Sequence, residues 1–167
     1  MFSNLRRPLS ALAVVALAGS TLAGCQAGQA ATVAGERISE TTVSVVAAEL
    51  PRVTGQGASQ SAALANLLIA TAITTAAGEN GMAMSDDDVR AALTNLKIDP
   101  ADISEETLQV AKASLLNQQI AASDKKQAIG ERITEILRSA DVNPRYGIDP
   151  AKGTAMAPPV WLVPKTQ

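Results

Sequence analysis

The sequence predicts a mainly α-helical protein, a small helical bundle that begins with a short β-hairpin. Three observations indicate this fold class. Apolar residues recur at helical spacing in several segments between positions 40 and 140. Serines that can cap helices, Ser39, Ser85 and Ser104, precede these segments. Val33 and Ile38 flank a turn that contains glycine, which is typical of a hairpin. Aromatic residues make up 2% of the chain, so we expect a core of Ala, Val, Ile and Leu.

The first helix is expected over residues 40–50, directly after the hairpin. Its apolar residues are spaced i, i+3, i+4 and i+7, with Ser39 as N-cap: Val43, Val46, Ala47 and Leu50. Its many β-branched residues leave a strand as the alternative. Pro51 is expected to end either element.

The most apolar helix is expected over residues 59–77. Its predicted buried stripe consists of Leu64, Leu67, Leu68, Ala72 and Ile73, with Ile69 to one side. Gly78 is expected to adopt the left-handed conformation that often ends a helix.

Two further helices begin at capping serines. Ser85 and Asp88 form an aspartate variant of the capping box, and Pro100 is expected to close that region. Ser104 precedes the next helix, whose first turn carries two glutamates. The predicted stripes are Val89, Ala92, Leu93 and Leu96 in one helix, and Leu108, Ala111, Leu115 and Ile120 in the other.

The end of the helical region allows two interpretations. Ser123-Asp124 can cap a separate last helix that carries Ile129, Ile133, Ile136 and Leu137. Alternatively, residues 104–140 form one helix in which Gly130 is a weak point of about 1 kcal/mol. Residues 142–167 are expected to be extended and to dock on the body, because disordered tails rarely carry Tyr, Trp, Val and Leu so close together. Pairing of this extended segment with the hairpin, as a further strand, is a second possibility.

The N-terminus carries an export pattern. Arg6 and Arg7 precede an almost purely apolar run over residues 9–18, and small residues follow up to Cys25. Cys25 is the only cysteine and closes the tetrad Leu22-Ala23-Gly24-Cys25. The arrangement resembles a bacterial lipoprotein signal peptide with its lipobox. The apolar run is shorter than the ~20 residues that a membrane-spanning helix needs.

This resemblance implies cleavage before Cys25 and lipid attachment to its sulfur. The implied organisation is a signal peptide (1–24), a tether (25–31), a helical domain (32–141) and the C-terminal segment (142–167). The implied location is the extracytoplasmic face of the cell membrane, with the lipid anchor as the membrane contact. Cleavage would remove two of the fourteen basic residues and none of the sixteen acidic ones, for a net charge of −4. Such acidity argues against a nucleic-acid partner.

The sequence contains no recognisable catalytic or metal-binding motif. It has no histidine, and lipid would occupy the sole thiol. Asp86-Asp87-Asp88 cannot begin an EF-hand loop, because Ala91 and Lys97 stand where that loop needs glycine and glutamate. Glycine-rich phosphate loops are also missing. We therefore expect no catalysis, no cofactor, no metal and no small-molecule substrate.

One family resemblance extends over most of residues 31–162. The predicted elements come in a fixed order. The Val-x-Gly-x-x-Ile hairpin (Val33, Gly35, Ile38) is followed by an apolar helix, an acidic-capped helix that begins at Ser85 and a longer helix pair. This order is similar to the N-terminal domain of SurA-type periplasmic chaperones. The segment from Val142 to Gly147 and the late Pro-Pro/Trp-Leu stretch look like lipoproteins of high-GC Gram-positive bacteria that carry this domain alone. The peptidyl-prolyl isomerase domains of SurA-type chaperones have no counterpart in this chain, so the resemblance implies no isomerase activity.

The function expected from these observations is binding of unfolded or extended segments of exported proteins. Met82, Met84 and Trp161 are the candidate contact residues, although buried packing is the more common role for each. The alternative is an envelope scaffold or accessory lipoprotein with one dedicated protein partner.

Overall fold

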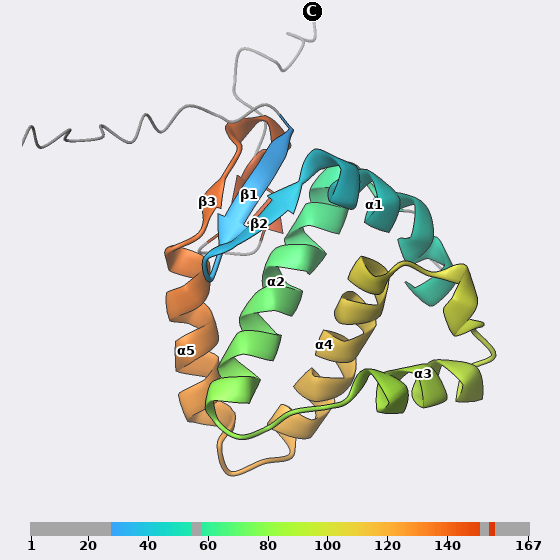
Figure 1. Cartoon of the computed structure of the whole chain (residues 1–167). Coiled ribbons are helices and arrows are strands. Elements are labelled where there is room, and N and C mark those ends of the chain that lie inside the picture. Colours follow the sequence, from blue (N-terminus) through green and yellow to red (C-terminus); the bar gives the residue numbers. More distant parts are fainter. Residues whose placement is uncertain (1–27, 55–57, 151–153, 156–167) are drawn as a thin grey trace, which may run out of the picture.

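The computed structural model describes residues 28–54, 58–150, 154 and 155 (Figure 1). It confirms a mainly helical fold with a small antiparallel sheet. The helices are α1 (Glu40–Thr54), α2 (Gln60–Glu79), α3 (Asp86–Asn95), α4 (Glu105–Ala121) and α5 (Lys126–Arg138), with short 3-10 turns η1 (Pro100–Asp102) and η2 (Pro144–Tyr146). The strands are β1 (Gln29–Val33), β2 (Glu36–Ser39), β3 (Asp141–Val142), β4 (Ile148–Asp149) and β5 (Thr154–Ala155).

The first sheet pairs the N-terminal hairpin with a short strand that follows α5. Its strand order is β2-β1-β3, with β1 antiparallel to both neighbours. Ala31 pairs with Ile38 on one side and with Val142 on the other. The hairpin is thus confirmed, and it does pair with the start of the C-terminal segment. Because β1 begins at Gln29, the expected tether over residues 25–31 overlaps the strand.

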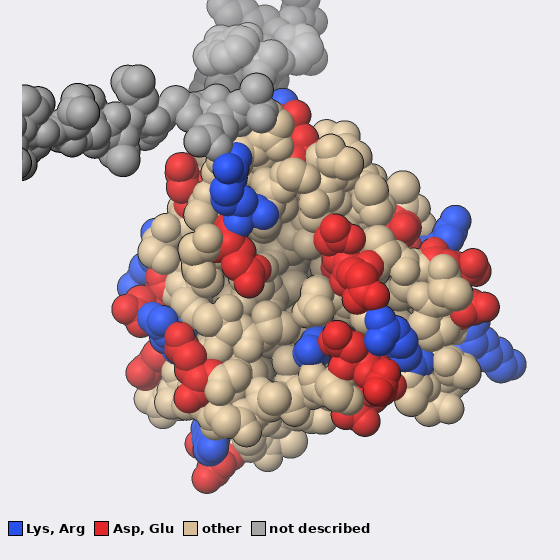
Figure 2. All heavy atoms as spheres, in the orientation of Figure 1, with Lys and Arg blue, Asp and Glu red and all other residues tan. Residues whose placement is uncertain are grey.

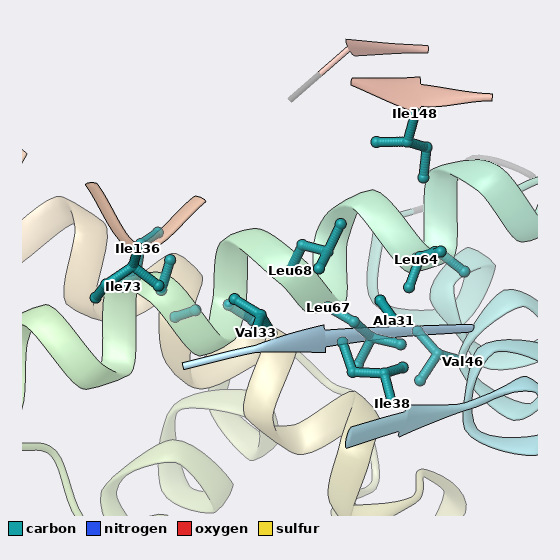
Figure 3. Close-up of a cluster of buried hydrophobic side chains, with 14 of the residues drawn as sticks. Ala31, Val33, Ile38, Val46, Leu64, Leu67, Leu68, Ile73, Ile136 and Ile148 are labelled. Carbon is teal, nitrogen blue, oxygen red and sulfur yellow. The ribbon is translucent and has the colours of Figure 1, made fainter. Parts of the chain in front are cut away.

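Helix α2 is the centre of the molecule. It packs against α1, α4, α5 and the sheet, and the predicted stripe along it is buried. Figure 3 shows Val33 and Ala31 of β1 and Ile38 of β2 beside Leu67, Leu68 and Leu64, with Ile148 of β4 on the opposite side of α2. Among the described residues, α2 alone is long and apolar enough to cross a membrane, and half of its most apolar window is buried in the molecule. Such burial is what the core helix of a globular domain shows.

A second, smaller core lies where α3 meets α4. It consists of Val89, Leu93, Leu108 and Ala111. Val53 at the end of α1 and Met84 in the α2–α3 connection pack on its edge. In Figure 1, α3 accordingly lies beside α4, away from the sheet.

The predicted capping serines are confirmed. Ser39 accepts a hydrogen bond from the backbone N–H of Thr42, Ser85 from that of Asp88, and Ser104 from that of Thr107. A side-chain oxygen at each position satisfies an N–H that the first helical turn leaves unpaired. Residues 40–50 are therefore helical, and the strand alternative is wrong.

Pro51 does not end the first helix, contrary to the sequence-based expectation. α1 continues to Thr54 with Pro51 inside it. A proline removes one backbone donor but does not unwind a helix whose last turn is held elsewhere. Here the Arg52 guanidinium donates to the Asp102 carbonyl at 2.7 Å, and Val53 packs on the smaller core.

Gly78 was expected in the left-handed conformation, but that conformation belongs to Gly81. Gly81 has φ +71°, whereas Gly78 lies inside α2. The backbone N–H of Met82 donates to the Ala77 carbonyl at 2.8 Å, which closes the helix end around Gly81. The helix therefore runs past Gly78 to Glu79.

Three other expectations about helix ends also need correction. Leu96 is 67% exposed rather than part of a buried stripe. Helix α3 ends at Asn95, well before Pro100, because Lys97 turns left-handed at φ +62°. Ser123-Asp124 does not cap a helix: α5 is separate from α4, but its N-cap is Lys125, and the Ser123 hydroxyl donates to the Ile120 carbonyl instead.

Candidate binding groove

Two adjoining hollows lie along one exposed side of α2. The first has a volume of about 340 Å³ and is lined by Ser59, Ser61, Ala62, Ala65, Asn66, Ile69 and Ile148. The second has a volume of about 300 Å³ and lies between α2 and α4. Both hollows are lined by Asn66 and Ile69, so they are neighbours along α2. We call this feature the α2 groove.

The floor of the α2 groove is one face of α2. Ala62, Asn66, Ile69 and Ile73 are spaced i, i+4, i+7 and i+11, which places them in a row along a helix. Figure 3 shows Ile148 on the opposite side of α2 from β1 and β2. The wall at the first hollow is thus a strand of the C-terminal segment, in addition to residues of α2 itself.

Helix α4 forms the wall of the second hollow. The residues that α4 contributes are Val110, Ala111, Ala113, Ser114 and Asn117. Val53 at the end of α1 completes the lining. Ile69 and Val110 are half-buried, while Ser114 and Asn117 are exposed. The groove therefore combines an apolar floor with a rim of hydroxyl and amide groups.

The α2 groove carries no formal charge, since every residue that lines either hollow is uncharged. This follows from the sequence of its two helices. Residues 60–78 contain no charged residue, and residues 107–121 contain only Lys112. Lys112 forms an ion pair with Asp86 at 2.9 Å. Figure 2 shows that on one face of the molecule charged side chains lie both at the edges and near the middle, with an uncharged strip between them.

The polar groups at the first hollow are partly engaged with backbone. Asn66 Nδ2 donates to the Ala62 carbonyl at 2.9 Å, and the Ser61 hydroxyl donates to the Tyr146 carbonyl at 2.8 Å. The second bond fixes η2 against the start of α2. Side-chain amides both donate and accept hydrogen bonds, which suits them to the backbone of an extended peptide.

A carboxylate in α1 ties the N-terminus of α4 to α1. Glu49 Oε2 accepts hydrogen bonds from the Ser104 backbone N–H at 2.8 Å, the Ser104 hydroxyl at 2.7 Å and the Thr107 hydroxyl at 2.6 Å. Thr107 is fully buried. Burial acts to raise the pKa of Glu49, but the hydrogen bonds from Thr107 and Ser104 outweigh it and hold that pKa below its ordinary value.

The other end of α2 is tied to α5 by a bidentate ion pair. Arg132 Nε and Nη2 donate to the two carboxylate oxygens of Glu79 at 2.7 and 2.9 Å. Arg132 Nη1 also contacts Glu135 at 2.8 Å. The hydrogen bond and charge of Arg132 lower the pKa of Glu79, and the two glutamates raise the pKa of Arg132.

Arg145 fixes the C-terminal segment next to the groove. Its guanidinium pairs with Glu40 at 2.7 Å, donates to the Tyr146 hydroxyl at 2.9 Å and lies 4.9 Å from the centre of the Tyr146 ring. Tyr146 itself is buried. These contacts hold η2, and through it Ile148, at the end of α2.

Of the candidate contact residues predicted from the sequence, the structure places two. Met82 and Met84 are half-buried and pack against the core, and neither lines the α2 groove. Trp161, Cys25 and the tetrad residues Leu22, Ala23 and Gly24 lie outside the described residues.

Sequence reasoning missed the residues that form the groove. Ile69 was noted only as lying beside the buried stripe, and Val110, Ser114 and Asn117 carry no motif. The available signal was the lack of charge over residues 60–78 and over most of 107–121, although at least one side of a surface helix is usually charged or polar.

In the part of the chain that the structure describes, no group of three or more His, Cys, Asp or Glu side chains is arranged to hold a metal ion. The three aspartates at the start of α3 have structural roles at a helix N-terminus. Asp86 pairs with Lys112, and Asp88 completes the cap with Ser85 at 2.6 Å. Comparison with protein-family models, with curated proteins and with solved structures found no match to this chain.

Proposed function

We propose that this protein is an exported, lipid-anchored binding protein that holds unfolded or extended apolar segments of other exported polypeptides in the α2 groove, without a chemical step. The observation that supports this best is the groove itself: two neighbouring hollows of about 340 and 300 Å³, lined only by uncharged residues. Extended apolar segments fit such a surface because burial of their side chains contributes roughly 25 cal/mol per Å² and no ionic group must be desolvated.

The rim of the groove favours a polypeptide over a lipid or hydrocarbon ligand. Ser59, Ser114 and the amide of Asn117 flank the floor, and the Asn66 amide lies among its apolar residues. Hydroxyl and amide groups can pair with the N–H and C=O groups of an extended chain, which would otherwise lose their bonds to water. Because the groove offers no charged group, discrimination among bound segments rests on shape and hydrophobicity. This is the pattern expected of a protein with several clients.

The lipobox at Leu22–Cys25 supports the proposed location. An acylated cysteine would hold the domain at the extracytoplasmic surface, with the lipid as its membrane contact. From Cys25 to the first described residue of the fold, Gly28, the chain is short, so the groove would remain close to the membrane through which clients emerge.

The proposed function can be tested by a binding and aggregation assay. The purified chain should bind fluorescent peptides of extended apolar sequence and suppress aggregation of several unrelated exported proteins at near-stoichiometric amounts. Ile69→Asp, which places a charge on the groove floor, should abolish both effects. Leu96→Asp is the matched control, because Leu96 is an exposed apolar residue directly after α3 that lines neither hollow.

The alternative function, a scaffold with one dedicated partner, predicts a different result. Such a protein would leave the aggregation of unrelated clients unchanged but would retain a single envelope protein after crosslinking in intact cells. Inhibition of aggregation that is equal in the native chain and in Ile69→Asp would contradict the groove as the binding site.

A further inference from the structure

The C-terminal end of α2 carries the dipeptide Asn80-Gly81. Asn80 is the only asparagine in the sequence that is followed by glycine. In this context the backbone can react with the side chain, because the Gly81 nitrogen can attack the side-chain carbonyl carbon of Asn80 and Gly81 has no Cβ to hinder the approach. Asn80 is half-buried and Gly81 is exposed, so water reaches this end of the helix.

The reaction balances with water as its only co-reactant. The Gly81 nitrogen loses its proton and forms a bond to Cγ of Asn80, the Cγ–Nδ2 bond breaks, and ammonia leaves. The product is a five-membered succinimide ring. Water then opens the ring at either of its two carbonyl carbons, which leaves aspartate or isoaspartate at position 80. One water is consumed and one ammonia is released, with no change in oxidation state.

The folded end of α2 opposes ring closure. Asn80 has ψ 11°, which places the Gly81 nitrogen beside the Asn80 backbone nitrogen, whereas the ring requires it on the side of Cβ. Both reacting groups are also hydrogen-bonded. Nδ2 of Asn80 donates to the Ala76 carbonyl at 2.8 Å, and the Gly81 N–H donates to the Gly78 carbonyl at 3.0 Å. Ring closure therefore needs rotation about ψ of Asn80 and the loss of both bonds.

Helix α5 holds this end of α2 in the unreactive conformation. Lys125 Nζ donates to the Asn80 carbonyl at 2.8 Å, and that carbonyl turns with ψ. The bidentate pair of Arg132 with Glu79 fixes the preceding residue at 2.7 and 2.9 Å. Lys125 is 45 residues from Asn80 in the chain, and Arg132 is 53 residues from Glu79. Protection of Asn80 is therefore tertiary as well as local.

We infer that Asn80 is a modification site, which deamidates by this intramolecular reaction when the junction between α2 and α5 opens. The inference does not depend on the α2 groove or on a bound client. In the product, a carboxylate replaces the amide that donates to the Ala76 carbonyl, and it lies at the negative end of the α2 dipole beside Glu79. The modified helix end is thus less stable than the original, so reaction favours further opening.

Mass spectrometry of the aged protein tests the site. The purified chain is incubated in mildly alkaline buffer, either folded or in guanidinium chloride, and the tryptic peptide 53–90 is examined for a gain of one mass unit at Asn80. We expect conversion in denaturant, and a rate at least about tenfold lower in the folded chain, the factor for an opening free energy of about 1.4 kcal/mol. Asn66, which lies in the same peptide before Leu67, is the internal control and should stay unmodified.

Variants in α5 test the tertiary protection. Lys125→Met and Arg132→Gln should each raise the rate in the folded chain roughly two- to fivefold, as expected for loss of an exposed charged contact. The rate in denaturant should not change, because neither residue is near Asn80 in the sequence. Lys126→Met is the matched control, since the exposed Lys126 side chain forms no hydrogen bond or ion pair with the described residues.

Three results would overturn the inference. Absence of conversion at Asn80 in denaturant would refute the site itself. A folded chain that reacts as fast as the denatured one would refute its protection by the fold. Rates for Lys125→Met and Arg132→Gln equal to the rate for Lys126→Met, with native circular dichroism in all three, would refute the role of α5.

The effect of the modification on stability has a separate test. Asn80→Asp gives one product directly and should lower the midpoint of thermal unfolding by about 2–4 °C. Asn95→Asp is the control: Asn95 is exposed at the end of α3, and its side chain has no hydrogen bond to the part of the chain that the structure describes. It places the same charge at a helix C-terminus and should have the smaller effect. Equal shifts would refute the role given to the bond between Asn80 and Ala76.

Discussion

The contact between Glu49 of α1 and the N-terminus of α4 makes a quantitative prediction about stability. One carboxylate oxygen, Glu49 Oε2, accepts three hydrogen bonds of 2.6–2.8 Å from Ser104 and Thr107. Hydrogen bonds to a charged group contribute roughly 1.5–3 kcal/mol each, but three that share one acceptor atom are not additive. Glu49→Ala also leaves the hydroxyl of Thr107, which is fully buried, without this acceptor. We therefore expect Glu49→Ala to lower the free energy of unfolding by about 2–3 kcal/mol.

The neutral variant Glu49→Gln isolates the contribution of the charge. It keeps the side-chain length and one carbonyl oxygen, so we expect a loss of about 1 kcal/mol at pH 7. The pKa of Glu49 in the folded protein lies below its ordinary value of 4.5. The stabilisation by ionised Glu49 is therefore fully present above pH 4.5 and decreases as the pH falls through the folded-state pKa. The native chain and Glu49→Gln should accordingly converge in stability below pH 4.5.

Urea unfolding followed by circular dichroism at 222 nm, at pH 7 and at intervals below pH 4.5, measures both effects. Glu106→Gln is the control, because Glu106 is an exposed carboxylate in the same first turn of α4 and its removal should change stability by only a few tenths of a kcal/mol. A loss below about 0.5 kcal/mol for Glu49→Ala, the range of an ordinary surface substitution, would refute the reasoning. A gap between the native chain and Glu49→Gln that stays constant with pH would also refute it.

Three further predictions follow from the ends of helices and from the N-terminus. Gly81→Ala should destabilise the fold by about 1–2 kcal/mol, because Gly81 has φ +71°. Gly78→Ala should stabilise it by about 0.5–1 kcal/mol, because Gly78 is helical and nothing lies within 4 Å of an added Cβ. If thermal unfolding gives the opposite order, Gly78 is the helix cap after all. Pro51→Ala should raise the free energy of unfolding by about 1–2 kcal/mol, since the new N–H can donate within α1, and a loss of stability in urea titration would contradict this account. Cys25→Ala should move the protein from the membrane fraction to the soluble extracytoplasmic fraction. The lipid anchor would be refuted if the variant stayed in the membrane fraction and the mass spectrum of the native chain showed an unmodified thiol.

Local interactions made much of the fold predictable from the sequence. The serine caps at Ser39, Ser85 and Ser104 bond to backbone N–H groups three residues away. The spacing of the apolar residues in α2 likewise predicts which side of that helix is buried. The hairpin around Gly35 is local for the same reason, since a two-residue turn with positive φ at Ala34 and Gly35 sets its register. The lipobox-like tetrad that ends at Cys25 is also a pattern of consecutive residues, and lipidation there stays a prediction.

Tertiary contacts decided where the helices end. Pro51 is an unfavourable residue within a helix, yet α1 continues because Arg52 and Val53 find partners near α3 and α4 that lie some fifty residues away in the chain. Glu79 extends α2 past Gly78 toward Arg132 of α5. Short-range propensity cannot register such partners, because each contributes only after the helices have packed.

The groove belongs wholly to the tertiary structure. Its lining comes from segments that are far apart in the sequence: Asn66 and Ile69 of α2, Ser114 of α4 and Ile148 of β4. These residues share a surface only because α4 packs on one side of α2 and the C-terminal segment packs on the other. The sequence alone determined that this surface would be uncharged, since residues 60–78 contain no ionisable side chain. Packing determined which of those uncharged residues remained open to a ligand, because burial of one face of a helix leaves the opposite face exposed.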